Sequence, residues 1–334
     1  MAAFAAPAAP LLALTLPTII FLPPHFVAHL GLPLGVVSAI FFGARLLDII
    51  IDPLLGSLQD RTQTRWGRRR LWLVASCPFL MALVWVVFVQ LGPGASVAAA
   101  GGAILLLYFV FAVMMVAHLG WAGEIVPTYH GRTHALGAVQ TASLVGQVIM
   151  LALAAVVVQG LGGTNADAVA AMGWTLVVML PLTVAVAVLG AREIKTPPQP
   201  HLGLREAITT VLGNAMARRV LLPDLLLGIA QGLSGGLFLF YFQYVLGFER
   251  ESQTLVAIFF IAGLIGVPIW WIAGRRFGKH KALQGALLYT AVTTLLLLVL
   301  PRGNFPVVAS FMIVAGLAQG GGRALDARAH GGRR

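Results

Sequence analysis

Three charged residues stand at helical spacing inside a long apolar stretch. Arg45, Asp48 and Asp52 occupy positions i, i+3 and i+7 of "ARLLDIIIDPLLG", so a helix places all three on one face. If the stretch crosses a membrane, a charge near its centre costs about 2.5 kcal/mol or more, and such residues must face one another or a cavity. An Arg–Asp pair that only fixes helix packing is one interpretation. It leaves a second carboxylate unexplained, and a spare buried carboxylate suits a proton or sodium site, so we predict a cation-coupling site.

A second group of polar and aromatic residues lies further along the chain, again in apolar stretches. His118 and Trp121 are three residues apart, so they share a helix face. Aromatic rings stack on sugar rings and imidazoles bond hydroxyl groups, which makes this face a candidate substrate surface. The alternative is an interfacial tryptophan beside a packing histidine. Three more polar side chains could line a solute path or form helix–helix hydrogen bonds: Gln140, Tyr241 and Tyr244.

The chain that carries these residues is too apolar for a soluble domain. Hydrophobic residues make up 59% of its 334 residues, charged residues only 10%, and its mean hydropathy is +0.92. Soluble domains carry about 25% charged residues. Stretches near the ~20 residues that cross a bilayer recur along the chain, which predicts an all-α polytopic membrane protein. Ten spans are predicted, at residues 10–30, 35–58, 71–91, 100–122, 136–160, 171–190, 220–246, 253–273, 281–301 and 305–320.

The basic residues predict how the chain is oriented. Of its 22 lysines and arginines, all but Arg45, Arg250 and Arg302 fall in loops and a tail that share one side of the membrane. The positive-inside rule makes that side cytoplasmic and places the N-terminus there. The net charge of +11 therefore belongs to cytoplasmic loops rather than to a nucleic-acid site. We expect an integral protein of the plasma membrane, in contact with lipid.

One long polar connection, residues 192–219, divides the chain. It separates a predicted N-terminal bundle of six spans (1–191) from a C-terminal bundle of four (220–320). The segments "DPLLGSLQDRTQTRWGRRRLWL" and "GVPIWWIAGRRFGKHKAL" each combine a proline-containing helix end with a short glycine-rich basic loop. Six spans separate them, as expected of two halves related by an internal repeat, and this favours a transporter.

Three runs of residues resemble one transporter family. "RLLDIIIDPLLGSLQDRTQTRWGRRR" (Arg45 to Arg70) resembles the signature of the glycoside–pentoside–hexuronide:cation symporters, the melibiose permease-like branch of the major facilitator superfamily. "AHLGWAGEIVPTYHGRT" is similar to the end of that family's fourth helix, and "FYFQYVLG" to part of its seventh. The resemblance covers about residues 10–318. It implies a major facilitator fold of twelve helices in two bundles, which couples a cation gradient to sugar uptake by alternating access.

The resemblance also implies roles for individual residues. Asp48 and Asp52 match the family's two cation-site acids, and Arg45 matches its neighbouring arginine. The loop after the second span matches a cytoplasmic gate that latches the two bundles in one state. The residues that correspond to this gate are Gly56, Asp60, Arg65, Arg68, Arg69 and Arg70.

Several positions depart from the melibiose permease. Ile51 and Ala112 stand where that permease has two neutral oxygen ligands of its cation site. Sodium needs several oxygen ligands whereas a proton needs one carboxylate, so a proton is favoured over sodium as the coupling ion. Met115 and Leu119 replace its sugar-contacting acid and tryptophan, and Gln140 replaces its arginine. Galactoside specificity therefore does not carry over.

The predicted function is secondary active symport of a sugar or glycoside with H⁺ or Na⁺. A lysolipid or another amphipathic solute is the alternative substrate, because lysolipid carriers belong to the same branch. An enzyme is not expected, since no HExxH or Gly-x-Ser-x-Gly motif stands on adjoining spans. The single cysteine, Cys77, excludes a cysteine-based metal site. We expect no cofactor beyond the co-transported ion, no nucleic-acid partner, and a monomer.

The last residues differ in composition from the rest. "GGRALDARAHGGRR" (321–334) has no apolar period and consists almost wholly of residues with G+C-rich codons. This composition is typical of out-of-frame translation, and only ten of the family's twelve spans are present. We therefore expect a C-terminal truncation, which would leave an inactive fragment. The alternative is a genuine basic cytoplasmic tail.

Overall fold

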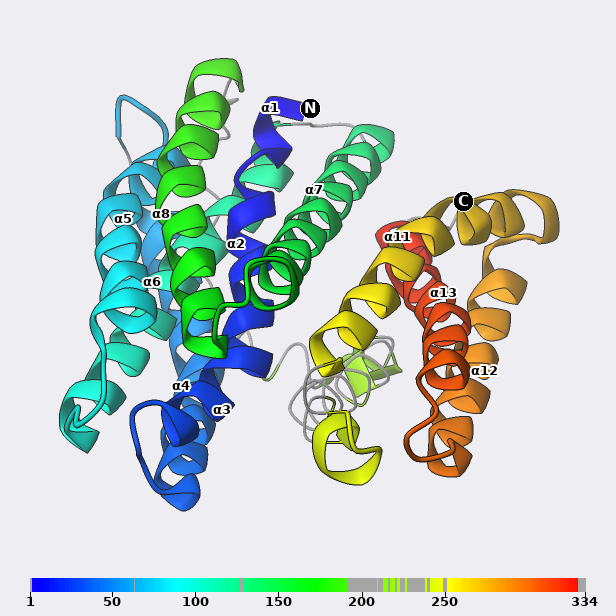
Figure 1. Cartoon of the computed structure of the whole chain (residues 1–334). Coiled ribbons are helices and arrows are strands. Elements are labelled where there is room, and N and C mark those ends of the chain that lie inside the picture. Colours follow the sequence, from blue (N-terminus) through cyan, green and yellow to red (C-terminus); the bar gives the residue numbers. More distant parts are fainter. Residues whose placement is uncertain are drawn as a thin grey trace.

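Long helices form the chain, and no strand occurs in the part that the computed structural model describes. That part comprises residues 2–62, 64–125, 129–191, 241–248 and 251–329, with isolated positions between 209 and 238. Figure 1 shows the helices in two groups, α1 to α8 in one and α11 to α13 in the other. The all-α prediction is confirmed within these residues. Helices satisfy all their backbone hydrogen bonds internally, as a lipid environment requires.

The first group contains six of the predicted spans. Its elements are α1 (Ala2–Ala5), α2 (Ala8–Leu16), η1 (Pro17–Phe21), α3 (Leu22–Ala28), α4 (Leu34–Arg61), α5 (Arg68–Trp85), η2 (Val86–Gln90), α6 (Val97–Ile125), α7 (Tyr129–Ala155), η3 (Val156–Gly160) and α8 (Asn165–Gly190). Among the described residues, six helices of the whole chain are long and apolar enough to cross a membrane. A seventh is α4, if its two segments, which meet at a 40° bend between Asp48 and Ile51, count as one span.

The bend in α4 has a cause in the sequence. Pro53 lies inside the helix, where its ring excludes the hydrogen bond to the carbonyl four residues earlier and kinks the chain there. The bend therefore falls between Asp48 and Asp52. The two carboxylates consequently lie on different segments of the helix rather than on one straight face.

The first span is continuous although it contains five prolines. Its prolines at positions 17, 23 and 24 predict a broken helix. The structure instead has a wide π-helical turn, η1, in which the Leu22 N–H donates to the Pro17 carbonyl. Pro23 stands in the first turn of α3, where a missing N–H costs little. One span therefore runs from Ala3 to Ala28, and the predicted break is wrong because the wider turn absorbs the lost hydrogen bond.

The second group contains the predicted spans near the C-terminus. Its elements are η4 (Tyr241–Val245), α11 (Ser252–Phe277), α12 (Lys279–Leu296), η5 (Leu297–Val299) and α13 (Phe305–Ala329). Most of the loop 192–219 and of the predicted span 220–246 lies outside the described residues. The predicted span 305–320 matches an apolar helix at Phe305–Ala318, and α13 continues beyond it to Ala329. Alanine, leucine and arginine, which dominate 323–329, are strong helix formers.

Helix α7 joins the two groups. It packs against α2 on one side and against α11 on the other. Gly146 of α7 lies so close to α2 that a Cβ atom would overlap the Ala9 carbonyl. In η3, which continues α7, the side-chain amide of Gln159 donates to the Thr254 hydroxyl of α11. A small residue such as Gly146 lets two membrane helices approach closely.

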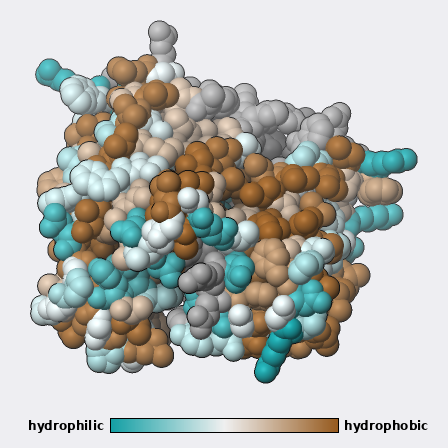
Figure 2. Space-filling view, viewed as in Figure 1, coloured by the Kyte–Doolittle hydropathy of each residue, from teal (hydrophilic) through white to brown (hydrophobic). Residues whose placement is uncertain are grey.

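The outside of the helices is strongly apolar. Large side chains are exposed around the first group, for example Phe42 at 65%, Phe79 at 64% and Leu189 at 87%. Figure 2 shows hydrophobic residues spread over broad areas of the visible face rather than in one patch. A soluble protein rarely exposes so much apolar surface. Together with the length of its helices, this surface identifies an integral membrane protein.

Candidate functional site

The predicted cation-coupling residues lie at the bend of α4. Arg45 Nη1 is 3.4 Å from Asp48 Oδ2, and the side chains are 48% and 23% exposed. The guanidinium carbon of Arg45 also lies 5.1 Å from the centre of the Tyr108 ring on α6, within the range of a cation–π contact. Asp52, beyond the bend, is exposed. The structure therefore pairs Arg45 with Asp48 and leaves Asp52 on the second segment of the helix.

A small pocket lies next to this pair. Three of the spans supply one wall each: α2 with η1, α4, and α6. The residues that line it are Leu14, Thr15, Thr18, Arg45, Leu107, Tyr108 and Phe111. Arg45 is thus at once the partner of Asp48 and part of the pocket wall. The threonines and Tyr108 give no signal in the sequence beyond being polar residues in apolar helices, and sequence reasoning missed them.

The predicted gate residues Asp60 and Arg69 form an ion pair between α4 and α5. Arg69 Nη1 also donates to Gln59 Oε1 at 3.0 Å, and Gln59 Nε2 donates to the Val113 carbonyl of α6 at 2.8 Å. Gly120 leaves room for the guanidinium, since a Cβ atom there would come within 2.7 Å of Arg69 Cζ. The cluster ties three helices together. Sequence reasoning missed Gln59, which is fully buried.

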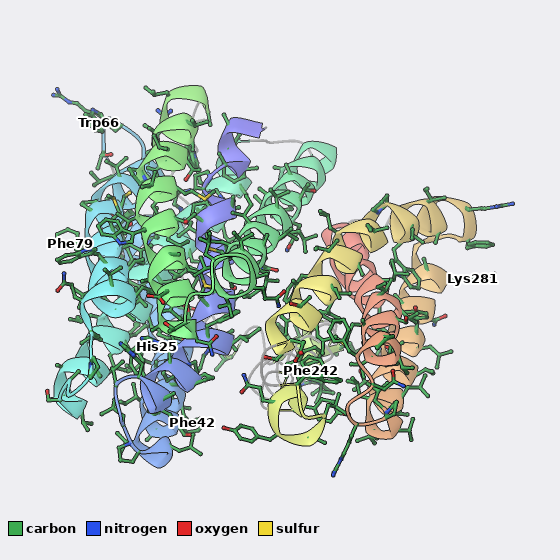
Figure 3. The ribbon with its side chains drawn as sticks, in the orientation of Figure 1. His25, Phe42, Trp66, Phe79, Phe242 and Lys281 are labelled. Atoms are coloured by element: carbon green, nitrogen blue, oxygen red, sulfur yellow. The ribbon has the colours of Figure 1, made fainter. Side chains whose placement is uncertain are left out.

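A second arginine fastens the same end of the bundle to α8. The Arg70 guanidinium donates to the carbonyls of Val188 and Ala191 at the end of α8, where helical carbonyls lack partners within the helix. It also lies 5.6 Å from the Trp121 ring centre. Figure 3 shows Trp66, in the loop between α4 and α5, at this end of the molecule and Phe42 towards the opposite end.

The other predicted gate residues differ in their exposure. Arg65 is exposed and Arg68 is half-buried. Gly56 faces open space, because no atom lies within 4 Å of a Cβ built there. The structure therefore gives Gly56 no close approach that would require glycine.

His118 and Trp121 lie in the interior of the first group rather than at a surface. Both are fully buried. Phe4 of α1 stacks on His118 with ring centres 4.8 Å apart and meets Trp121 edge-on at 5.6 Å. Within the described residues, neither imidazole nitrogen of His118 nor the Trp121 Nε1 has a hydrogen-bond partner. In this conformation they are packing residues and do not line the pocket, because α1 covers them.

The remaining predicted substrate residues are also away from the pocket. Gln140 is half-buried on α7. The Tyr241 hydroxyl donates to the Leu297 carbonyl, which ties η4 to η5. Tyr244 is 79% exposed. No cluster of three or more metal-ligating His, Cys, Asp or Glu side chains occurs within the described ranges.

Comparison with known proteins places these features in a family. The model of the family "MFS/sugar transport protein" matches residues 3–326. The inner membrane symporter YicJ of Escherichia coli is 25% identical over 243 residues, which cover 71% of this chain and 52% of YicJ. A sodium-dependent lysophosphatidylcholine symporter of Xenopus tropicalis is 23% identical, covering 84% of this chain and 61% of the symporter. The raffinose carrier protein of Pediococcus pentosaceus is 23% identical, covering 76% and 42%.

The same fold is found in a solved structure. The xylose transporter XylE of Escherichia coli, in an inward-open conformation, superposes with a TM-score of 0.51 at 16% identity, over 96% of this chain and 78% of XylE. The chain spans about half to three-fifths of the length of the first two relatives, 52% of YicJ and 61% of the lysophosphatidylcholine symporter. Because the family model matches nearly the whole chain, the chain belongs to the MFS/sugar transport proteins and has the major facilitator fold.

Proposed function

We propose that this protein carries out secondary active transport, in which a sugar or glycoside moves together with a cation by alternating access. The observation that carries the proposal is the Arg45–Asp48 pair at the wall of a pocket between α2, α4 and α6. Charged groups inside membrane spans are costly and mark ion or solute pathways. Relatives named as a raffinose carrier and a putative glycoside/cation symporter support the sugar and the coupled cation. In this proposal the two helix groups move relative to each other, so that the solute site opens first to one side of the membrane and then to the other.

Asp48 and Asp52 are the proposed cation-site residues, and a proton is the favoured ion. Ile51 and Ala112, at positions where the melibiose permease has oxygen ligands, belong here to an apolar cluster with Leu55. Such a cluster offers sodium no ligands, because hard cations of this kind need several oxygens around them. A proton needs only the carboxylate. Binding and transport need no cofactor beyond this ion, and we expect the protein to act as a monomer.

Uptake into energised membrane vesicles tests this function. We expect labelled glycosides to accumulate when an inward proton gradient is imposed, and a sodium gradient alone at fixed pH to have little effect. Lysophosphatidylcholine is the rival substrate, because a symporter for it covers 84% of this chain and because aliphatic and aromatic side chains make up most of the pocket wall. If that lipid accumulates and no glycoside does, the transported solute is the lipid and not a sugar. Equal uptake with and without any gradient would contradict symport altogether.

We also propose that the end with the Asp60–Arg69 cluster is cytoplasmic, so that this cluster is the gate between spans two and three. The prediction uses two exposed loop positions at opposite ends of the helices: Trp66, 67% exposed, and Leu161, 77% exposed. In intact cells, an impermeant thiol reagent should label Leu161→Cys, and should label Trp66→Cys only after permeabilisation. The native Cys77 is buried and gives little background. The reverse pattern would contradict the orientation that the basic residues predict.

A further inference from the structure

We infer that α1 is a lid over the seam between the first span and α6, and that its opening brings solvent towards the pocket that Arg45 lines. The seam is the line along which residues of the span Ala3–Ala28 face α6. The lid follows from buried polar atoms and does not depend on what the protein transports. Its role in the passage of solute rests on the proposed transport function.

The first support is a cluster of buried polar atoms that make no hydrogen bond. Among the described residues, buried side-chain nitrogen and oxygen atoms without a partner belong only to Arg70, His118 and Trp121. They are the Arg70 Nε, both imidazole nitrogens of His118 and the Trp121 Nε1. The Arg70 guanidinium carbon lies 5.6 Å from the Trp121 ring centre, so the cluster is continuous. A buried polar group that makes no hydrogen bond costs its full desolvation penalty, and this cost is concentrated here.

Phe4 of α1 covers this cluster. Its ring centre is 4.8 Å from that of His118 and 5.6 Å from that of Trp121, and Phe4 is fully buried. Burial of the phenyl ring therefore keeps water away from the polar atoms. The gain from burying one phenylalanine and the cost of leaving polar groups unpaired are of the same order. The closed and open positions of α1 are consequently close in free energy.

The backbone attaches α1 weakly to the rest of the span. The helix is a single turn, and Ala6 and Pro7 separate it from α2. A single turn has little stability of its own, and Pro7 has no N–H to donate. The Ala6 N–H donates to the Ala3 carbonyl at 3.4 Å, beyond the usual range for this bond. The turn at Ala6 and Pro7 is therefore the hinge on which α1 can swing while α2 stays packed on α7.

The lid lies at the end of the helices where Arg70 fastens α5 to α8. Figure 1 shows α1 between α7 and α8 at this end, and α1 packs against both. A Cβ atom at Gly190, near the end of α8, would come within 2.6 Å of the Ala3 Cβ. The Arg70 guanidinium binds the carbonyls of Val188 and Ala191 beside it. This is the end that we propose to be cytoplasmic, so the lid would act on exchange with that side.

The covered cluster also lies on the same face of α6 as the pocket. Phe111 lines the pocket, and Met114, His118 and Trp121 follow it at spacings of three or four residues, which places all four on one stripe of the helix. His118 is seven residues beyond Phe111, a distance of about 10 Å along a helix. With α1 open, about two helical turns of buried seam remain between solvent and the pocket. Opening of the lid is therefore a step by which the pocket gains access to this end.

Cysteine reactivity of the purified full chain tests whether α1 opens. Ala5 on the lid is 3% exposed and Ala154 on α7 is fully buried, so Ala5→Cys and Ala154→Cys are matched reporters. N-ethylmaleimide should alkylate Ala5→Cys about tenfold or more faster than Ala154→Cys, because local opening costs less than unfolding of the bundle. The native Cys77 is buried, and the unaltered protein supplies its background rate.

Variants of the covered cluster separate a lid from ordinary packing, because they have opposite expected signs. Phe4→Ala removes the ring that holds α1 closed and should raise the alkylation rate of Ala5→Cys about fivefold or more. His118→Leu removes two unpaired nitrogens and keeps apolar volume, so it should lower this rate about fivefold. Trp121→Phe removes the unpaired N–H, keeps a ring, and should act in the same direction as His118→Leu. If His118 only packed against Phe4, its replacement would loosen α1 and raise the rate.

The outcomes distinguish the inference from the proposed function. Equal alkylation of Ala5→Cys and Ala154→Cys, or an unchanged or raised rate in His118→Leu, overturns the lid. The counterflow rate tests the role in passage: His118→Leu should slow it in proportion to the alkylation rate, and unaltered counterflow overturns that role. If the lid fails while a glycoside accumulates with a proton gradient, the proposed function stands. If the alkylation rates are as expected but the unaltered protein moves no solute, the lid stands and the proposed function is overturned.

Discussion

Replacing Asp48 or Asp52 with asparagine should abolish uphill accumulation of the solute. An asparagine cannot take up and release a proton, so the solute should still equilibrate across the membrane but reach an inside-to-outside ratio of only about one. The two variants should differ in binding. Asp48 is the partner of Arg45 at 3.4 Å, whereas Asp52 lies beyond the bend of α4, so only Asp48→Asn should change solute binding in the pocket that Arg45 lines.

The measurement is the steady-state accumulation of labelled solute in energised vesicles, together with counterflow in the absence of a gradient. Glu251→Gln, an exposed acid before α11, is the matched control and should accumulate solute normally. Full concentrative uptake by both aspartate variants would show that Asp48 and Asp52 have only a structural role in ordering the helices. Loss of counterflow as well as accumulation would point to failure of folding or of solute binding, and the thermal midpoint would separate these two causes.

The second large effect is expected at Gly146, where α7 meets α2. A Cβ atom there would overlap the Ala9 carbonyl and approach the Ala13 side chain to 3.1 Å. The atom that must yield is backbone, so Gly146→Ala should separate the two helices. Overpacking of this kind costs about 1 to 3 kcal/mol or more. The same helix joins the two groups through α11, so we also expect transport to fall.

The control for this prediction lies on the same helix. Gly137 has no atom within 4 Å of its hypothetical Cβ, and alanine is the better helix former by about 1 kcal/mol. Gly137→Ala should therefore leave the thermal midpoint of the purified protein unchanged or raise it, whereas Gly146→Ala should lower it by several degrees. Equal midpoints would show that the close approach of α2 and α7 does not limit stability.

The sequence alone predicted the six long apolar helices of the described residues, the bent helix α4 and the contact of Arg45 with Asp48, whereas the predicted spans 281–301 and 305–320 form shorter apolar helices. Apolar length sets where a helix can cross a bilayer, whatever its neighbours are. Two side chains at i and i+3 meet on any helix, so the Arg45–Asp48 contact follows from local geometry. The concentration of arginines in one set of loops can likewise be recognised in the sequence without knowledge of the fold.

Only the tertiary structure decided how these elements meet. The ion pair of Asp60 with Arg69 and the link from Gln59 to Val113 join helices that are apart in the sequence. Phe4 covers His118, so a polar residue that the sequence offered as a substrate contact is buried. Such contacts depend on which helix faces are turned towards each other, and residue type and spacing do not encode this.

The pocket between α2, α4 and α6 shows most clearly what the sequence determined and what the tertiary structure decided. The sequence supplied Arg45 and its charge, but the pocket exists because Thr15, Tyr108 and their neighbours on α2 and α6 are brought to the same side of α4. The bend at Pro53 then places Asp52 on the second segment of α4. Spacing along one helix predicts which residues share its face, whereas packing between helices and the kink of one of them decide which of those residues share a site.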